Sequence, residues 1–470
     1  MKLHNTLTHS IQDFVPLDPE KTRLYSCGPT VYNHIHIGNL RAFIMADTLR
    51  RVLALDGSVT HVMNFTDVDD KTIRSSASQY PDMSAEEALS TLTQHYEQIF
   101  RNDMDRIGND LTAMTFIRAT ESIDDMRQLI TNIYDSGFAY LGDDGVYFSI
   151  EKYRASGKTY GQLLHLDSSN TSDSRINNDE YDKDSIHDFA LWKIRKEGEP
   201  AWEFNLGDTD ITGRPGWHIE CSAMSHKLLG QPFDIHTGGV DLIFPHHENE
   251  IAQSTAGLDN KIYATVFVHN EHLLVEGKKM SKSLGNFYVL SDLVEKGYDP
   301  LAFRLLALQS HYRNQTNFSW DNLTAAGHRL NSLRNISRYR YQAVSTAEHF
   351  EPEYLAGITS RFTDAMQDDL NTPEALAAIS SLVTKLERHG LHTDQLADFV
   401  KLLEVIDGLM GLSLLVLPDI SNTQQKLLAE RQTARDQKDW GLSDKLRDQL
   451  NSDGIVVKDM PYGQIWSIQT

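Results

Sequence analysis

The chain has 470 residues, a formal net charge of −22 and two cysteines, Cys27 and Cys221. This length exceeds what one hydrophobic core usually serves, so we expect several domains. Two cysteines exclude a disulfide framework, and the acidic balance argues against indiscriminate nucleic-acid binding. The sequence shows no signal-like or membrane-spanning apolar run, which predicts a cytoplasmic protein without a membrane partner.

The first half of a nucleotide-binding fold is predicted near the N-terminus. Residues 23–27 indicate a short buried strand, and residues 36–39 open a helix with apolar side chains at helical spacing. A second strand is expected over residues 57–65, and Thr66-Asp-Val-Asp-Asp70 follows it. Ligands bind at the carboxyl edge of a parallel sheet, so residues 66–70 lie in a functional position. We expect the aspartates to cap the next helix rather than hold Mg²⁺.

An insertion is predicted to interrupt this fold over residues 116–208. Residues 80–135 have a helical pattern, and Asp144-Gly145 is typical of a hairpin turn. Residues 166–186 are polar, acidic and almost free of apolar side chains, which favours a mobile surface loop.

The nucleotide-binding fold is expected to resume near Arg214. Cys221 is placed at the end of a strand, ahead of a helix to Leu229. A buried strand over residues 233–236 and a helix that starts at Pro245 come next, followed by a strand over residues 263–269. The predicted class is therefore α/β with a Rossmann-type parallel sheet.

The C-terminal part is predicted to be helical from about residue 290, with a small α+β domain of two charged helices and a strand pair after Pro418. Basic side chains there are candidates for contacts to RNA phosphates: Arg329, Arg334, Arg338, Arg340, Lys426, Arg431, Arg435, Lys438, Lys445 and Arg447. Trp440, Tyr462 and Trp466 are candidates for base stacking, although core packing is favoured for Trp466.

Two segments have the chemistry of a nucleotide site. His36-Ile-Gly-Asn39 opens a helix, whose N-terminal amides attract phosphate, and Gly38 has no Cβ to block a base. Residues 278–283, Lys-Lys-Met-Ser-Lys-Ser, are suited to the charge that develops on pyrophosphate. The alternatives are an ordinary βα turn for residues 36–39 and a solvated basic loop for residues 278–283. The presence of both elements after separate strands of one fold favours a functional site.

These two segments resemble the signatures of class I aminoacyl-tRNA synthetases. His36-Ile-Gly-Asn39 is similar to HIGH, with Asn39 in place of the last histidine, and Lys279-Met-Ser-Lys-Ser283 matches KMSKS. The resemblance implies that His36 and Lys282 stabilise the transition state of amino-acid adenylation by ATP with Mg²⁺, that Lys279 assists, and that Gly38 and Asn39 contact ATP.

The candidate metal ligands suit zinc, which takes thiolate, imidazole and carboxylate donors in four-coordinate geometry. Four residues supply them: Cys27, Cys221, His246 and Glu250. The last two are four residues apart on one face of the predicted helix. Spacing alone does not choose between His246 and His247, or between Glu248 and Glu250, and each residue alone is explained by packing or by exposure.

Long stretches of the chain resemble the cysteinyl-tRNA synthetase family, among them residues 27–33, 214–224 and 244–254. The resemblance implies one zinc ion on Cys27, Cys221, His246 and Glu250, with His247 and Glu248 behind the ligands or at the surface. It also implies a cysteine pocket of Thr66, Trp217 and His236. The partners it implies are L-cysteine, ATP and tRNA(Cys), with the helical bundle and the tail engaging tRNA.

The resemblance also orders the domains. It implies a class I catalytic domain over residues 1–115 and 209–275, with a connective domain inserted over 116–208. The later domains would be a linking domain over 276–320, a helical bundle over 321–418 and an anticodon-binding domain over 419–470. We expect a monomer, because no sustained apolar heptad is present.

Zinc would explain how cysteine is told from serine, which differs from it by one atom. Pockets that sense only size discriminate such pairs weakly, whereas zinc tests for a thiolate. Discrimination of ~10⁴-fold requires roughly 5.5 kcal/mol, which a metal–thiolate bond supplies. We therefore expect no editing domain, and the insertion is predicted to support the acceptor end of tRNA.

Two other functions are considered. The first is a mycothiol-pathway ligase that joins cysteine to an amino sugar, against which residues 421–470 argue. The second is a catalytically inactive zinc- and RNA-binding protein, which only Asn39 supports.

Overall fold

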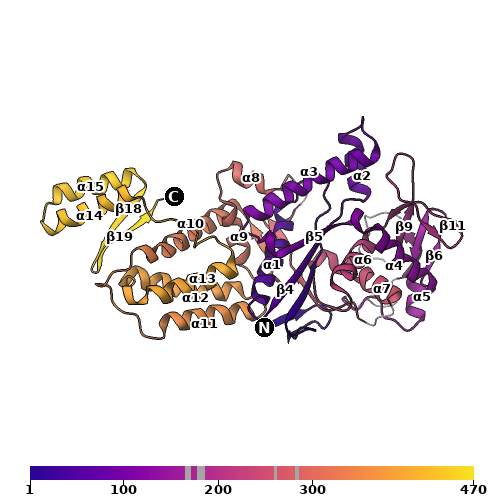
Figure 1. The fold of residues 1–470 in the computed structure, drawn as a ribbon, viewed down its shortest axis with the longest axis horizontal. Helices are drawn as coiled ribbons and strands as arrows, with labels where there is room; N and C mark the ends of the chain where they lie inside the picture. Colours follow the sequence, from indigo (N-terminus) through magenta and orange to yellow (C-terminus); the bar gives the residue numbers. More distant parts are fainter. Residues whose placement is uncertain (165–170, 177–185, 259–261, 281–284, 470) are drawn as a thin grey trace. The chain divides into compact units, whose positions relative to one another are not determined.

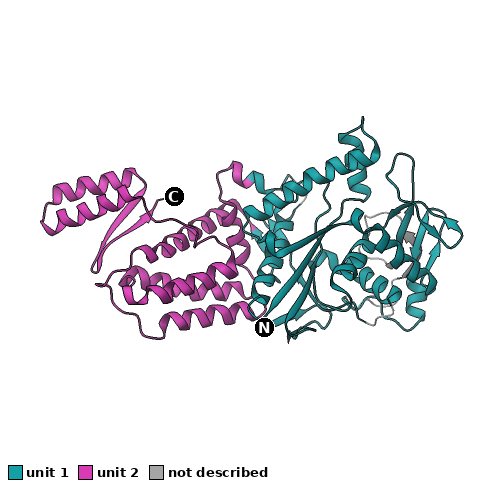
Figure 2. Cartoon of the chain, in the orientation of Figure 1, with its two compact units in different colours: residues 1–292, 312–317 teal, residues 293–311, 318–470 magenta. Residues whose placement is uncertain are grey.

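The computed structural model describes residues 1–164, 171–176, 186–258, 262–280 and 285–469. Lys282 and most of the acidic segment 166–186 therefore lie outside the described residues. The chain divides into two compact units, residues 1–292 with 312–317 and residues 293–311 with 318–470 (Figure 2). Among the described helices, none is long and apolar enough to cross a membrane.

Unit 1 contains the predicted parallel sheet, with five strands in the order β14-β13-β3-β4-β5 (Figure 1). Each neighbouring pair is parallel, which confirms the Rossmann-type α/β class. The strands are β3 (Lys21–Ser26), β4 (Ser58–Phe65), β5 (Met114–Arg118), β13 (Phe233–Gly239) and β14 (Ala264–Asn270).

The strand order reverses beside β3. From β3 the chain moves outward through β4 to β5, and it then returns to place β13 and β14 on the other side of β3. The carboxyl ends of β3 and β13 therefore border the crevice in which such sheets bind ligands. Cys27 directly follows β3, and its amide donates to the carbonyl of Thr237 in β13 at 3.2 Å.

Helix α1 (Ile37–Leu53) forms where it is predicted, between β3 and β4. Its N-cap is His36, whose Nδ1 accepts a hydrogen bond from the amide of Asn39 at 3.2 Å. The apolar stripe is buried as expected and comprises Leu40, Phe43, Ile44 and Leu49. Asp69 caps α2 (Asp70–Gln79) through a capping box with Thr72, which confirms the capping prediction for this aspartate. The prediction is wrong for the other two, because Asp67 accepts hydrogen bonds from Thr120 and Asp70 pairs with Lys193 and Arg214.

The prediction of continuous helix over residues 80–135 is wrong at β5. Helix α3 (Ala85–Arg106) ends before this strand, and α4 (Ile123–Asp135) begins after it. The five residues of β5 are too few to establish a period, and their strand identity comes from pairing with β4. The insertion predicted from residue 116 would have begun inside the sheet.

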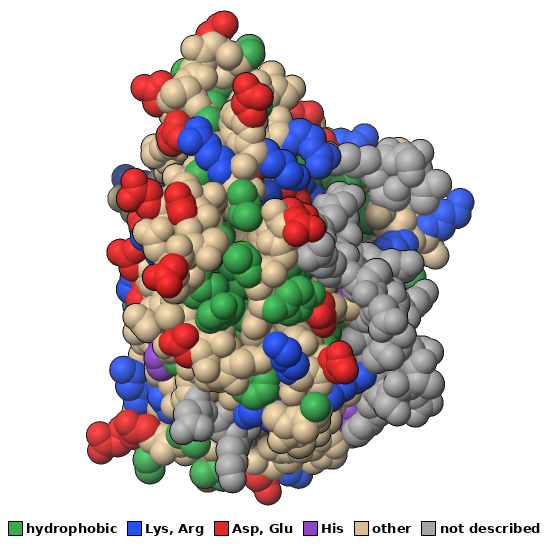
Figure 3. Space-filling view, turned by 90° about the vertical axis from the view of Figure 1, so that its right-hand side faces the viewer, with side chains coloured by type: hydrophobic (Ala, Val, Ile, Leu, Met, Phe, Trp, Pro, Cys, Tyr) green, Lys and Arg blue, Asp and Glu red, His purple; other side chains and the backbone are tan. Residues whose placement is uncertain are grey.

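A second sheet of unit 1 has the order β12-β9-β7-β6. β6 (Ala139–Leu141) and β7 (Gly145–Phe148) form the predicted hairpin, and β9 (Ile186–Ile194) continues the sheet to β12 (Gly213–Pro215). β8 (Thr171–Ile176) pairs with β9, so the expectation of a loop is wrong for these six residues. The face at this end shows acidic and basic side chains interspersed around a small apolar group (Figure 3).

One of two predicted helix starts differs in the structure. α6 (Trp217–Leu229) begins right after Gly216, so Cys221 lies on a helix and not at a strand end. β12 is shorter than predicted because Gly216 already serves as the N-cap of α6. Phe244 has extended dihedral angles, and Pro245 then begins a helical turn that continues directly into α7 (Glu248–Gly257), which confirms the helix start predicted at Pro245.

Shorter elements complete unit 1. Residues after β14 form a small sheet of order β16-β15-β17, in which β15 and β16 are antiparallel. Their bounds are Leu273–Val275 for β15, Lys278–Lys279 for β16 and Thr316–Phe318 for β17. The remaining elements are β1 (Lys2–Asn5), β2 (Ser10–Asp13), α5 (Ile150–Ala155), β10 (Asn205–Leu206) and β11 (Thr209–Asp210).

Unit 2 is helical up to its tail, as predicted. Its main helices are α9 (Pro300–Leu308), α10 (Trp320–Ser337), α11 (Tyr354–Gln367), α12 (Thr372–His389) and α13 (Leu396–Met410). The tail has its own apolar core between two helices and the predicted strand pair. These elements are α14 (Asn422–Asp436), α15 (Trp440–Ser452), β18 (Ile455–Met460) and β19 (Gly463–Ile468).

Several side chains predicted to contact RNA instead form contacts within unit 2. Arg431 is fully buried and forms two hydrogen bonds of 2.8 Å to Asp459. Arg340 donates to the carbonyls of residues 414, 415 and 417. Tyr462 and Trp466 are each 7% exposed, whereas Trp440 is 56% exposed. Core packing is confirmed for Trp466, and stacking on bases is wrong for Tyr462.

We predict that Arg431→Ala weakens the tail. The substitution leaves Asp459 without a bidentate partner and lowers the free energy of local opening by about 2–3 kcal/mol. Amide hydrogen exchange in α14, β18 and β19 measures this change. Arg447→Ala, which removes an exposed pair to Asp444, is the matched control and should change exchange by less than about 0.5 kcal/mol. Equal effects of both substitutions would contradict the assignment.

Candidate functional site

A cavity of about 430 Å³ lies at the carboxyl edge of the parallel sheet in unit 1. It brings together side chains that are far apart in the sequence. Those predicted to be functional are Cys27, His36, Gly38, Asn39, Trp217 and Lys279. The nucleotide signatures and one metal ligand therefore line one cavity.

The nucleotide end of the cavity leaves no room for a side chain at Gly38. A Cβ there would lie 2.9 Å from the imidazole of His36 and 3.3 Å from Cε of Met280. Residues 287–289 contact the start of α1. The amide of Ile37 donates to the carbonyl of Tyr288 at 2.9 Å, and the His36 and Phe287 rings lie edge to face.

Lys279 reaches the same cavity from β16 and is exposed. It pairs across the hairpin with Leu274 of β15, whereas its neighbour Lys278 pairs with Val275. Lys278 is not among the cavity-lining residues in the part of the chain that the structure describes. Successive side chains of a strand point to opposite faces, which explains the difference.

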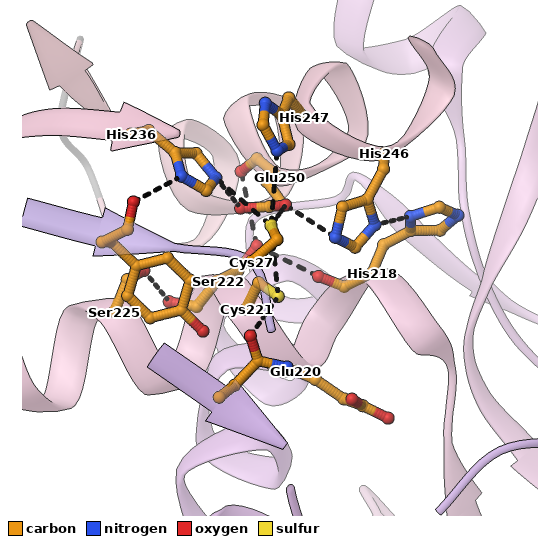
Figure 4. Close-up of polar contacts among 12 residues, drawn as sticks. Cys27, His218, Glu220, Cys221, Ser222, Ser225, His236, His246, His247 and Glu250 are labelled. Atoms are coloured by element: carbon orange, nitrogen blue, oxygen red, sulfur yellow. Dashed lines mark hydrogen bonds and ion pairs between the residues drawn. The ribbon is translucent and has the colours of Figure 1, made fainter. Parts of the chain in front are cut away.

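The four predicted metal ligands converge on one point (Figure 4), and one of them, Cys27, lines the cavity. Sγ of Cys27 lies 3.9 Å from Sγ of Cys221 and 3.8 Å from Oε1 of Glu250. Nε2 of His246 lies 3.0 Å from the same Oε1. Tetrahedral ligands around zinc stand about 3.3–3.8 Å apart, so this donor set fits the ion in distance and in chemistry.

A second set of donors overlaps the first and replaces Cys221 and His246 by His236 and His247. Nε2 of His247 lies 3.3 Å from Sγ of Cys27, and Nε2 of His236 lies 2.8 Å from Oε2 of Glu250. Geometry thus leaves two alternatives around Cys27 and Glu250, in which the other two donors are either Cys221 and His246 or His236 and His247. Only the first set contains both cysteines of the chain.

Of the two places predicted for His247 and Glu248, behind the ligands or at the surface, the surface is wrong, because both residues are buried. Glu248 accepts hydrogen bonds from the amides of residues 161, 162 and 163 at 2.7, 3.1 and 3.1 Å. It therefore ties the start of α7 to the inserted segment. Nε2 of His247 contacts Sγ of Cys27, so this imidazole lies next to the predicted ligands.

Charge at the centre is concentrated on Glu250. Burial by itself would raise the pKa of this carboxyl, but the imidazoles of His236 and His246 hold it well below its usual value. Burial would likewise lower the pKa of His246, and the charge of Glu250 instead raises it to about 10. The thiols differ: burial raises the pKa of Cys27, whereas a hydrogen bond with Cys27 lowers the pKa of Cys221 to about 6.

Further side chains that the sequence did not single out orient these donors. Nδ1 of His246 lies 2.8 Å from Nδ1 of His218, and the hydroxyl of Tyr263 donates to Oε2 of Glu250 at 2.8 Å. Nδ1 of His247 lies 2.8 Å from Nε2 of His269. One signal in the sequence could have indicated these side chains. Polar residues stand at the end of an apolar strand and at the start of a helix, which is typical of a buried polar cluster.

The three residues predicted to form the cysteine pocket differ from one another in where they lie relative to the cavity. Trp217 lines the cavity and its ring stacks on His246 with centroids 4.1 Å apart. His236 is buried beside Cys27, with Sγ and Nε2 4.0 Å apart. Thr66 is buried and donates to Glu220 at 2.7 Å, and it is not among the described residues that line the cavity.

Family comparisons match this architecture along most of the chain. Residues 13–328 match the catalytic domain of class I (C) tRNA synthetases. Residues 361–415 match the DALR domain, and residues 417–466 match the cysteinyl-tRNA ligase anticodon-binding domain.

Solved structures of low identity show the same fold. Methionyl-tRNA synthetase of Mycobacterium tuberculosis, with methionyl-adenylate, superposes with a TM-score of 0.60 at 13% identity, over 86% of this chain and 95% of that one. A putative arginyl-tRNA synthetase of Campylobacter jejuni gives 0.55 at 12% identity, over 85% and 93%. The fold is that of a class I aminoacyl-tRNA synthetase.

Curated relatives specify the member of that class. A cysteine–tRNA ligase of Leptospira interrogans is 38% identical and one of Solibacter usitatus is 41% identical, each match covering 99% of both chains. A cysteine–tRNA ligase of Chlamydia muridarum is 40% identical over 97% of both chains. The chain belongs to the cysteine–tRNA ligase family.

We predict that zinc affinity rises with pH. The metal-free site holds a proton on His246 and one on Cys27, because the pKa of each is raised, and a metal ion must displace both. Between pH 7 and 8.5 the logarithm of the association constant should therefore rise by about two per pH unit. Competition with a chelator of known affinity measures it, and an affinity independent of pH would contradict this protonation state.

Proposed function

We propose that this enzyme activates L-cysteine with ATP and Mg²⁺ to cysteinyl-adenylate and transfers the cysteinyl group to the 3′ end of tRNA(Cys), acting as a monomer. The observation that carries the proposal is the convergence of Cys27, His36 and Lys279 on one cavity in a member of this family. A site that tests for sulfur then lies next to the site that activates the carboxylate.

We propose Cys27, Cys221, His246 and Glu250 as the metal ligands. Zinc bound there would supply a coordination position that prefers a thiolate to a hydroxyl. The stack of Trp217 on His246 and the bond from Tyr263 to Glu250 fix the donors in place. His236 contacts Cys27 from the same side as Glu250 and is suited to line the place where the substrate side chain enters.

The nucleotide part of the proposal rests on the two signatures. The positive dipole end at the start of α1 is suited to phosphate, and Gly38, which lines the cavity, has no Cβ to keep adenine from its backbone. Lys279 points into the cavity, where its charge would stabilise the pyrophosphate that leaves. Lys282, in the same signature, is proposed to act with it. Thr66 is proposed to support the cysteine pocket through Glu220.

The tRNA part of the proposal assigns the tail to the anticodon and the inserted segment to the acceptor end. Trp440 is the exposed aromatic residue of α15 and is suited to stack on an unpaired base. The interspersed charges of the inserted end do not form a surface of one sign (Figure 3). RNA would therefore be held there by individual contacts and not by a continuous basic field.

Cysteine-dependent exchange of pyrophosphate into ATP, followed by charging of tRNA(Cys), tests the function. We expect both in zinc-loaded protein and neither after the metal is removed. Charging of an amino sugar instead of tRNA would indicate the related ligase. Absence of exchange from a folded, zinc-loaded sample would indicate an inactive RNA-binding protein.

Substitution of the two adjacent histidines separates the overlapping donor sets. His246→Ala should abolish stoichiometric zinc and cysteine activation, because a direct ligand is lost. His247→Ala should keep one zinc per chain, with affinity lower by about 10–100-fold, as expected for a group that only supports a ligand. Metal analysis of the purified variants measures this. The reverse result would assign zinc to the second set.

The two adjacent lysines of β16 provide an equally close comparison. Lys279→Ala should lower kcat of the exchange reaction by about 10²–10³-fold, as is typical when one donor to developing charge is removed. Lys278→Ala should change it by less than about threefold, since this side chain lies on the other face of the hairpin. Similar losses in both variants would show that only net charge matters.

A further inference from the structure

Arg41 is a buried guanidinium that contacts four backbone carbonyls. It lies in the second turn of α1, two residues after the signature residue Asn39, and is 2% exposed. It donates to the carbonyls of Glu271 and His272, the latter at 3.0 Å. It also donates to the carbonyls of Tyr312 and Asn314, at 3.4 and 2.6 Å.

These carbonyls precede two strands of the small sheet β16-β15-β17. Residues 271 and 272 lead directly into β15, and residues 312 and 314 lead into β17. The two segments are also joined to each other, because the amide of Glu271 donates to the carbonyl of Tyr312 at 2.9 Å. Arg41 therefore holds both strands at the ends where they enter the sheet.

This sheet carries the second nucleotide signature. β15 turns directly into β16, and β16 ends at Lys279, which lines the cavity. The first signature lies at the N-terminus of α1, on the same rigid helix as Arg41. One side chain thus connects the helix of His36 and Gly38 to the sheet of Lys279.

A second connection lies after the second signature in the chain. Residues 36 and 37 pair with residues 288 and 289 through a backbone bridge and a hydrogen bond of 2.9 Å. Residues 273–289 are consequently attached to α1 at both ends, by Arg41 before the hairpin and by the backbone after it. Removing Arg41 would release the end that carries Lys279.

We propose that Arg41 is a positioning residue for cysteine activation, which sets the distance between the two nucleotide signatures by clamping the small sheet to α1. The inference rests on the proposed roles of His36 and Lys279. Arg41 does not line the cavity, so it acts through Lys279 and not on the substrate. A misplacement of about 1 Å at such a site can lower a rate by about 10²-fold.

The chemistry of the clamp requires arginine. A planar guanidinium has five N–H donors in a fixed fork and can reach carbonyls from two segments at once. A lysine ammonium has three donors on a flexible stem and would hold one segment more readily than both. Arg41→Lys is therefore the informative conservative variant, and Arg41→Ala leaves a space for added guanidinium.

The test uses the full-length, zinc-loaded chain and cysteine-dependent ATP–pyrophosphate exchange. We expect Arg41→Lys to lower kcat by about 10–100-fold, with KM for cysteine and zinc content unchanged, because the metal site lies on other elements. Arg41→Ala should lose at least as much, and millimolar guanidinium should restore part of its kcat. Arg51→Ala is the matched control, since Arg51 lies on the same helix and binds Asp47 and the carbonyl of Gly108.

Three outcomes would overturn the inference. They are an unchanged kcat in Arg41→Lys, a loss no larger than the unfolded fraction of the sample, and an equal loss in Arg51→Ala. If Arg41→Ala does not fold, Arg41→Lys decides by itself. Failure of the proposed nucleotide site is seen separately, as full activity of Lys279→Ala. A defective Lys279→Ala together with active Arg41 variants would refute only the clamp.

Discussion

The buried carboxylate of Glu250 is the interaction on which the rest of the site depends. It is fully enclosed and lies within 3.0 Å of the imidazoles of His236 and His246. A charge in such a place is tolerated only when its neighbours compensate it. The polar side chains around it come from four places: Cys27 just after β3, Cys221 of α6, His236 of β13 and His246 just before α7. The reversal of strand order beside β3 is what allows these elements to meet, and the cavity opens directly above them.

The proposed metal ligands and the proposed pyrophosphate contact stand on different parts of unit 1. The four proposed ligands lie at the edge of the main sheet and on the helices beside it, whereas Lys279 belongs to a short hairpin. In the proposed function, this separation would let one part test the substrate side chain while the other places charge on ATP. Two arginines of unit 2 stabilise the unit itself. Arg340 and Arg431 serve internal contacts, so these two of the basic side chains predicted to contact RNA are engaged within unit 2.

Regular periodicity predicted the long elements of the fold well. The strands at β3, β4, β13 and β14 and the apolar stripe of α1 follow patterns that a single sequence displays. The errors fall where an element is short or where its identity depends on a partner. β5 has five residues and is a strand because β4 pairs with it, and part of the acidic segment is the strand β8 because β9 pairs with it. The start of α6 at Trp217 depends on the backbone conformation of Gly216, which follows β12 and is the N-cap of the helix.

The sequence by itself determined the chemistry: two cysteines, a histidine and a glutamate four residues apart, and two nucleotide signatures in the order of a class I synthetase. Only the tertiary structure decided which donors meet. It placed Cys27 within reach of both His246 and His247, buried Glu248 against residues 161–163, and enclosed Thr66 against Glu220. The physical reason is that these distances depend on strand register and helix placement between segments up to 223 residues apart, and no local periodicity encodes them.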